Sequence, residues 1–112
     1  MFANLNNRSY VIIILTLLTA GIHLFLGLTV PDTLFILNGL GYIALLIGLY
    51  FVPQLAGMRK WIRWVFILYT AVTIILFFVF QGADAFSSVL GLVTKVIELA
   101  LIVLLWLDRG VD

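Results

Sequence analysis

Four long apolar segments constrain this chain more than any other feature of its sequence. They cover approximately residues 9–29, 33–51, 58–81 and 84–108. They are separated by short breaks that contain Pro31, Pro53 and Gly82. The hydrocarbon core of a bilayer is about 30 Å thick, so a helix needs about 20 apolar residues to cross it. Only helices and closed barrels satisfy the backbone in lipid, and these segments lack the alternating pattern of barrel strands. The sequence therefore predicts an all-α polytopic membrane protein, a bundle of four transmembrane helices in up-down-up-down order.

Composition supports this class and argues against several others. Of the 112 residues, 65% are hydrophobic and only 10% are charged, whereas soluble domains are about 45–50% apolar. The absence of cysteine rules out disulfides and thiolate metal sites. A net charge of +1 without a basic patch argues against nucleic-acid binding.

We expect a single transmembrane domain over residues 1–112, in the plasma or inner membrane. Its first apolar run exceeds the roughly 7–15 residues of a signal peptide, so we expect that helix to be retained.

Basic residues gather on one side of the predicted bundle. They lie near the termini and in the region of the second loop: Arg8, Arg59, Lys60, Arg63 and Arg109. The first and third loops carry only acidic charges, Asp32 and Asp84, which are candidate helix N-caps. The positive-inside rule therefore predicts that both termini are cytoplasmic. Aromatic rings on the same border complete a predicted membrane-interface anchor that contacts lipid headgroups: Arg59, Lys60, Trp61, Arg63, Trp64 and Trp106.

Two ionisable residues, Lys95 and Glu98, lie in the middle of the last apolar segment. They are three residues apart and so share a helix face. A central lysine costs about 2.5–3.5 kcal/mol on insertion, so such residues are expected to face inward and to pair. We expect additional partners on the other helices, which gives a predicted buried polar cluster of His23, Asn38, Tyr42, Tyr69, Lys95 and Glu98. The pair could be a closed structural ion pair, a site where Glu98 titrates or binds a cation, or a contact with a charged partner protein.

Other motifs argue against cofactor chemistry and catalysis. His23 is the only histidine, and no second strong nitrogen or sulfur ligand is available, so we interpret it as a hydrogen-bonded core residue. No metal site and no cofactor are expected. The Gly39-Leu40-Gly41 motif follows no strand, so it indicates close helix packing and not a nucleotide loop. Because no catalytic arrangement is present, we expect a protein that is not an enzyme.

In size and helix number the chain resembles the small multidrug-resistance transporters and the fluoride channels, which are oligomeric four-helix proteins. The former carry a glutamate in the first helix, where this chain has His23 and no acid. The motifs therefore assign it to neither group.

Three functions follow as hypotheses. The leading one is a non-enzymatic accessory or scaffold subunit that packs in a homo-oligomer or in a larger membrane complex, with membrane lipids and membrane proteins as partners. The first alternative is a small oligomeric transporter or channel with a midplane site at Glu98, Lys95, His23 and Asn38. A further alternative is a protein that binds quinone, haem or another apolar cofactor in the bundle core.

Overall fold

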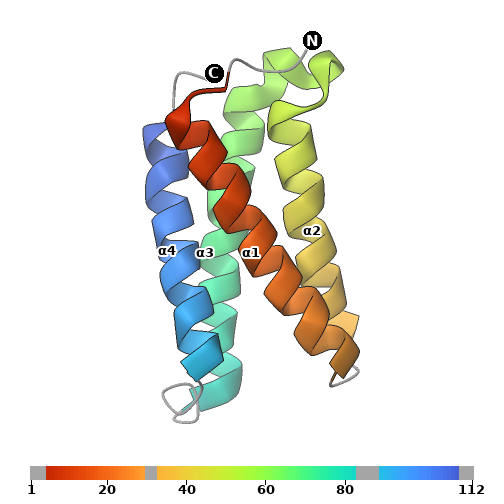
Figure 1. The fold of residues 1–112 in the computed structure, drawn as a ribbon, viewed down its shortest axis with the longest axis vertical. Helices are drawn as coiled ribbons and strands as arrows, with labels where there is room; N and C mark the ends of the chain where they lie inside the picture. The colour runs from red at the N-terminus through yellow and green to blue at the C-terminus, as the bar shows by residue number, and fades with distance from the viewer. Residues whose placement is uncertain (1–4, 30–32, 83–88, 109–112) are drawn as a thin grey trace.

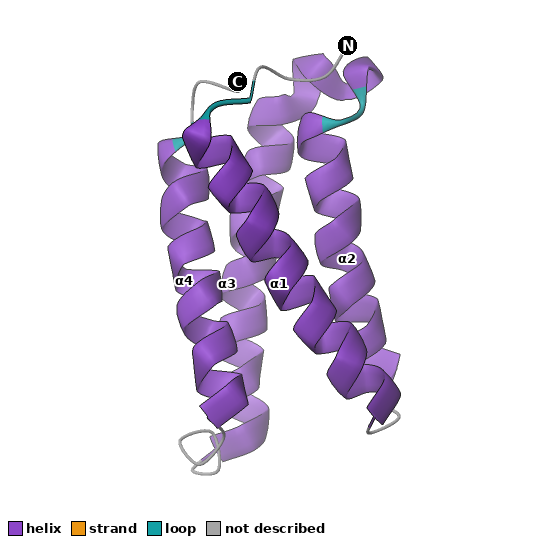
Figure 2. Cartoon of the chain, viewed as in Figure 1, coloured by secondary structure: helices purple, strands orange, loops and turns teal. Residues whose placement is uncertain are grey.

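The computed structural model describes residues 5–29, 33–82 and 89–108, which fold into four long helices (Figure 1). These are α1 (Asn7–Thr29), α2 (Thr33–Tyr50), α3 (Arg59–Gln81) and α4 (Val89–Leu107), with a short 3-10 helix, η1 (Pro53–Met58), before α3. The described residues contain no strand (Figure 2). Each of the four α-helices is long and apolar enough to cross a membrane. This confirms the predicted all-helical fold with four candidate membrane spans.

Local sequence explains the helix ends that the structure describes. Pro53 begins η1, where a proline has no helical hydrogen bond to lose. Gly82 ends α3 with a φ of 57°, a left-handed conformation that favours glycine, and its N–H donates to the carbonyl of Phe78. The predicted caps Asp32 and Asp84 lie outside the described residues, as do positions 84–88 of the predicted last helix.

The helices form two antiparallel pairs, and α1 packs along α2 while α4 packs along α3 (Figure 1). The start of α1, the end of α4 and η1 lie at one end of the molecule, which we call the terminal end. At the opposite end the two pairs diverge. The molecule thus has one closed end and one split end, with a longest dimension of 42 Å.

Glycines on α2 allow close contact with both neighbouring helices. A Cβ added to Gly39 would lie 2.9 Å from the backbone oxygen of Ala20 on α1. A Cβ added to Gly41 would overlap the hydroxyl of Tyr69 on α3. The Gly39-Leu40-Gly41 motif therefore lies where α2 touches α1 and α3.

The apolar core is concentrated near the terminal end. All four helices contribute fully or nearly fully buried side chains to it: Ile12, Leu46, Leu49, Tyr50, Phe66, Leu101 and Leu105. These residues belong to the first halves of α1 and α3 and to the second halves of α2 and α4. The terminal half of the bundle is thus closed by packed side chains.

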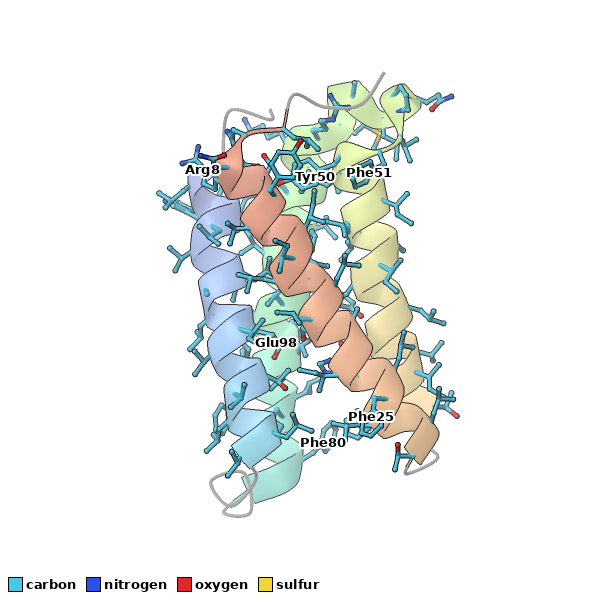
Figure 3. The ribbon with its side chains drawn as sticks, viewed as in Figure 1. Arg8, Phe25, Tyr50, Phe51, Phe80 and Glu98 are labelled. Carbon is cyan, nitrogen blue, oxygen red and sulfur yellow. The ribbon has the colours of Figure 1, made fainter. Side chains whose placement is uncertain are left out.

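A polar network ties the helices together beside this core. The carboxylate of Asp108 is 1% exposed, and its Oδ2 accepts from the Tyr50 hydroxyl at 2.6 Å and from Ser9 Oγ at 3.3 Å. Its Oδ1 accepts from Arg8 Nε at 3.4 Å. We call Arg8, Ser9, Tyr50 and Asp108 the terminal polar network; Arg8 and Tyr50 are labelled in Figure 3. It joins the start of α1 to the ends of α2 and α4.

Candidate functional site

The ion pair of α4 lies in the middle of the bundle, where Figure 3 labels Glu98. Lys95 Nζ donates to Glu98 Oε1, and the two side chains are 6% and 0% exposed. Glu98 Oε2 accepts from the Tyr42 hydroxyl at 2.5 Å and from Thr19 Oγ1 at 3.3 Å. Both carboxylate oxygens are therefore satisfied, by groups from α1, α2 and α4. Such pairing is what a buried charge requires, because burying an unpaired charge is very costly.

His23 lies next to this pair without a hydrogen bond to Glu98. Its Nδ1 is 2.8 Å from the backbone oxygen of Thr19. Because a carbonyl oxygen only accepts, Nδ1 carries the proton. In the neutral ring, Nε2 is then an acceptor, and it has no hydrogen-bond partner among residues 5–29, 33–82 and 89–108. The ring packs near those of Phe35 and Tyr42, with centroids 6.1 and 5.9 Å away.

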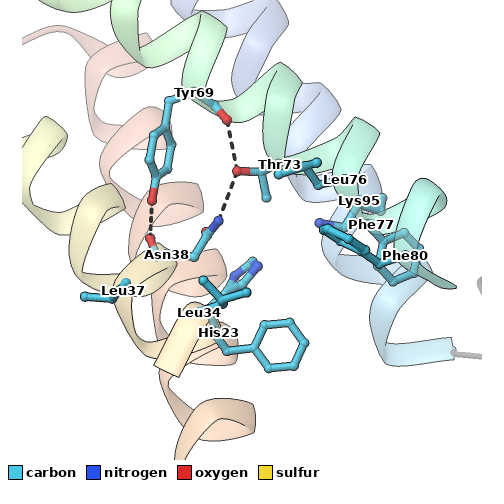
Figure 4. A pocket seen from close by; sticks show the side chains of 11 residues that line it. His23, Leu34, Leu37, Asn38, Tyr69, Thr73, Leu76, Phe77, Phe80 and Lys95 are labelled. Carbon is cyan, nitrogen blue, oxygen red and sulfur yellow. Dashed lines mark hydrogen bonds between the residues drawn. The ribbon is translucent and has the colours of Figure 1, made fainter. Parts of the chain in front are cut away.

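Asn38 and Tyr69 form a second group, which links α2 to α3 (Figure 4). The Tyr69 hydroxyl donates to the backbone oxygen of Asn38 at 2.6 Å. The Thr73 hydroxyl donates to the Tyr69 backbone oxygen at 2.9 Å, so its oxygen is left to accept from Asn38 Nδ2 at 3.1 Å. These bonds fix the orientation of the amide. Asn38 Oδ1 is buried and has no hydrogen-bond partner within the described part of the chain.

A cleft of about 510 Å³ separates the two helix pairs beside these polar groups (Figure 4). It is lined by His23, Leu34, Phe35, Leu37, Asn38, Tyr69, Thr73, Leu76, Phe77, Phe80 and Lys95. A smaller cavity of about 100 Å³ lies toward α1 and α4 and shares His23, Phe35, Phe77 and Lys95 with the cleft. Small-molecule sites have volumes of about 300–1,000 Å³ and are mostly apolar with a few polar groups. The larger cleft has the size and lining of such a site.

The structure distributes the six residues of the predicted polar cluster over two connected groups. Tyr42 and Lys95 bind Glu98 directly. His23 is attached through Thr19, whereas Asn38 and Tyr69 are bonded to each other and to Thr73. The rings of Tyr42 and Tyr69 meet edge to face at 4.9 Å and connect the groups.

Several residues of the site were outside the predicted cluster. Thr19 is four residues before His23, and Thr73 is four residues after Tyr69, so both share a helix face with a predicted member. That spacing is a signal in the sequence. Phe35 also lies three residues before Asn38, but spacing alone does not single out Phe35 or Phe77, because many apolar residues on these helices have equivalent spacing.

The predicted interface-anchor residues all lie toward the terminal end, but not all of them are at its surface. Lys60 and Trp61 are exposed, and the rings of Trp64 and Trp106 meet edge to face at 5.2 Å.

The two arginines of this group bind helix ends. Arg59 Nε donates to the Leu49 carbonyl at 3.1 Å. Arg63 is only 2% exposed and donates to the Leu105 carbonyl at 3.1 Å. These guanidinium groups therefore satisfy carbonyls in the last turns of α2 and α4, where the helix dipole favours positive charge.

Within the described ranges, no group of three or more His, Cys, Asp and Glu side chains could hold a metal ion. No protein-family model matches the chain, and no curated protein or solved structure shows significant similarity to it.

Proposed function

We propose that this protein binds an amphipathic small molecule within the membrane, in the cleft between α2 and α3. The observation that carries the proposal is the cleft of about 510 Å³ with the polar residues His23, Asn38 and Lys95 in its lining. A bundle selected only for stability would gain by filling this space, because an unfilled cavity loses dispersion contacts. Polar atoms in the wall raise that cost further unless something binds them.

Binding without catalysis fits the chemistry of the wall. Glu98 does not line the cleft, and both of its oxygens accept hydrogen bonds from Lys95, Tyr42 and Thr19. Lys95 has three N–H donors and uses one on Glu98, and its Nζ lies 5.0 Å from the ring centroid of Phe77 in the cleft wall. The lysine can therefore donate to a ligand without leaving its carboxylate.

The direction from which a ligand enters follows from the distribution of charge. If the positive-inside rule holds, the terminal end with its arginines and Lys60 is cytoplasmic. The cleft would then lie in the outer half of a plasma or inner membrane. A ligand would enter it from the outer leaflet or from the outside.

A cleft-filling substitution tests this proposal. Leu76 lines the cleft, whereas Leu68 on the same helix does not line it and is 63% exposed. The protein is reconstituted in lipid nanodiscs and irradiated with a diazirine derivative of octanol, and the crosslinked residues are mapped by mass spectrometry. We expect crosslinks in residues 34–38 and 69–80, reduced about tenfold in Leu76→Trp, a loss of about 1.4 kcal/mol.

The control variant is Leu68→Trp, which adds the same ring to the outer face and should leave the pattern unchanged. Labelling spread evenly over all exposed helix faces, and equal in both variants, would contradict a binding cleft.

The accessory or scaffold role predicted from the sequence, by helix packing in a homo-oligomer or in a larger membrane complex, remains a second proposal. Purification in a mild detergent with identification of all co-purifying proteins tests it. A transporter would require the packed terminal half to open, and flux that is lost in Glu98→Gln would favour that alternative.

A further inference from the structure

Three residues that line the cleft each have a polar atom with unused hydrogen-bonding capacity. His23 Nε2 and Asn38 Oδ1 are acceptors without a partner in the described ranges, and the Lys95 ammonium has donors beyond the one that Glu98 receives. The imidazole is neutral, because the charges of Lys95 and Glu98 already balance and a cationic His23 would be buried without a counter-charge. The lining residues thus carry two acceptors that are unpaired in the described part of the chain, of which Asn38 Oδ1 is itself buried, and one charged donor (Figure 4).

This pattern discriminates between classes of head group. A carboxylate would accept from Lys95 but would face the two acceptors, His23 Nε2 and Asn38 Oδ1. A quaternary ammonium would be repelled by the Lys95 ammonium. It would also lack a counter-charge, because both oxygens of the nearby Glu98 carboxylate already accept hydrogen bonds. An ether or ester accepts but has no hydrogen to donate, so both acceptors would stay unsatisfied in a desolvated site. A neutral hydroxyl both donates and accepts, so it can donate to one of the two acceptors and accept from Lys95.

Aromatic side chains make up a large part of the lining. Rings come from His23 on α1, Phe35 on α2, and Tyr69, Phe77 and Phe80 on α3, and the remaining apolar wall consists of leucines. Aromatic pairs prefer offset or edge-to-face contact and gain energy beyond their buried area. A flat ring therefore fits between α2 and α3, and an alkyl tail fits along Leu34, Leu37 and Leu76.

We infer that the cleft takes a neutral phenol-type ring with an apolar tail. Its hydroxyl donates to His23 Nε2 or Asn38 Oδ1 and accepts from Lys95. This inference rests on the proposed function, because it names the class of ligand for the same cleft.

Competition between matched probes tests the inference. 4-Octylphenol, its methyl ether 4-octylanisole, and octanoate are each added to the protein in nanodiscs, and displacement of the diazirine-octanol crosslink is measured. We expect the phenol to displace the crosslink at an about tenfold lower concentration than the ether, since the two differ mainly in one hydrogen-bond donor. Octanoate is expected to be the weakest competitor.

Substitutions locate the acceptors. His23→Phe keeps a ring beside Phe35 and Asn38→Leu keeps the volume, and each should reduce the preference for phenol over ether several-fold. Tyr50→Phe is the matched control, since it removes one buried hydroxyl in the terminal polar network, away from the cleft. It should leave the preference unchanged.

The outcomes separate the inference from the proposed function. If the probe crosslinks to the cleft but phenol and ether compete equally, or octanoate competes best, the ligand class is wrong while the cleft remains a binding site. If the probe does not label the cleft at all, the proposed function itself fails. The comparison of probes on the unaltered chain decides the point even where a variant does not fold.

Discussion

Individual residues show how this chain accommodates charge in an apolar bundle. Glu98 accepts from Lys95, Tyr42 and Thr19, so a carboxylate with no exposure has a donor for each oxygen. Breaking such a pair is costly because it leaves one charge alone, although the intact pair itself adds little stability. The pair therefore constrains which helices can meet at the middle of the bundle.

Removing one charge is predicted to cost more than removing both. Lys95→Met leaves the Glu98 carboxylate without its cation and should destabilise the protein by about 3–5 kcal/mol. The double variant Lys95→Met with Glu98→Gln carries no charge at this position and keeps an amide oxygen for Tyr42 and Thr19. It should recover most of the loss, as measured by thermal unfolding in detergent. A double variant as unstable as Lys95→Met alone would show that charge balance is not what the pair provides.

At the scale of the helices, α2 makes close contacts with both α1 and α3. Gly39 brings its backbone against α1, and Gly41 leaves room for Tyr69 of α3. Small residues have this role in membranes because lipid provides little hydrophobic drive between helices, so close packing must hold them together. The end of α2 is in turn capped by Arg59 from α3.

Gly39→Ala is predicted to separate α1 from α2. The added methyl would lie 2.8 Å from Leu24 Cγ and 2.9 Å from the Ala20 carbonyl oxygen, so the helices must shift. Overpacking of this kind costs about 1–3 kcal/mol, which thermal unfolding in detergent would report. Gly21→Ala on α1 is the control, because nothing lies within 4 Å of its added methyl. That variant should be neutral or slightly stabilising, since alanine has the higher helix propensity. Equal destabilisation by both would contradict this packing.

The whole molecule combines a sealed half with a split half. Packed side chains and the terminal polar network hold the terminal end together, while the cleft separates the helix pairs in the other half. The cleft therefore belongs to the split half, with Tyr69 and Lys95 among its lining residues.

The orientation of this asymmetric molecule can be measured directly, because the chain has no cysteine and each introduced thiol is unique. Thr33 begins α2 at the split end, and Lys60 lies in the first turn of α3 at the terminal end; both are exposed. On intact cells, a membrane-impermeant maleimide should label Thr33→Cys and should label Lys60→Cys only after permeabilisation. The reverse pattern would place the cleft in the cytoplasmic half.

The sequence by itself determined the four apolar helices and the need of Lys95 and Glu98 for partners. Both follow from local properties, namely the length of an apolar run and the spacing of two charges on one helix face. Only the tertiary structure decided that Glu98 meets Thr19 and Tyr42, that Asn38 turns to Thr73, and that Asp108 is buried against Tyr50. These choices, and the cleft itself, depend on how each helix is rotated and where the pairs diverge. The sequence of a single helix encodes neither its rotation nor the point of divergence. In an apolar helix several faces are nearly equivalent until the neighbouring helices are in place.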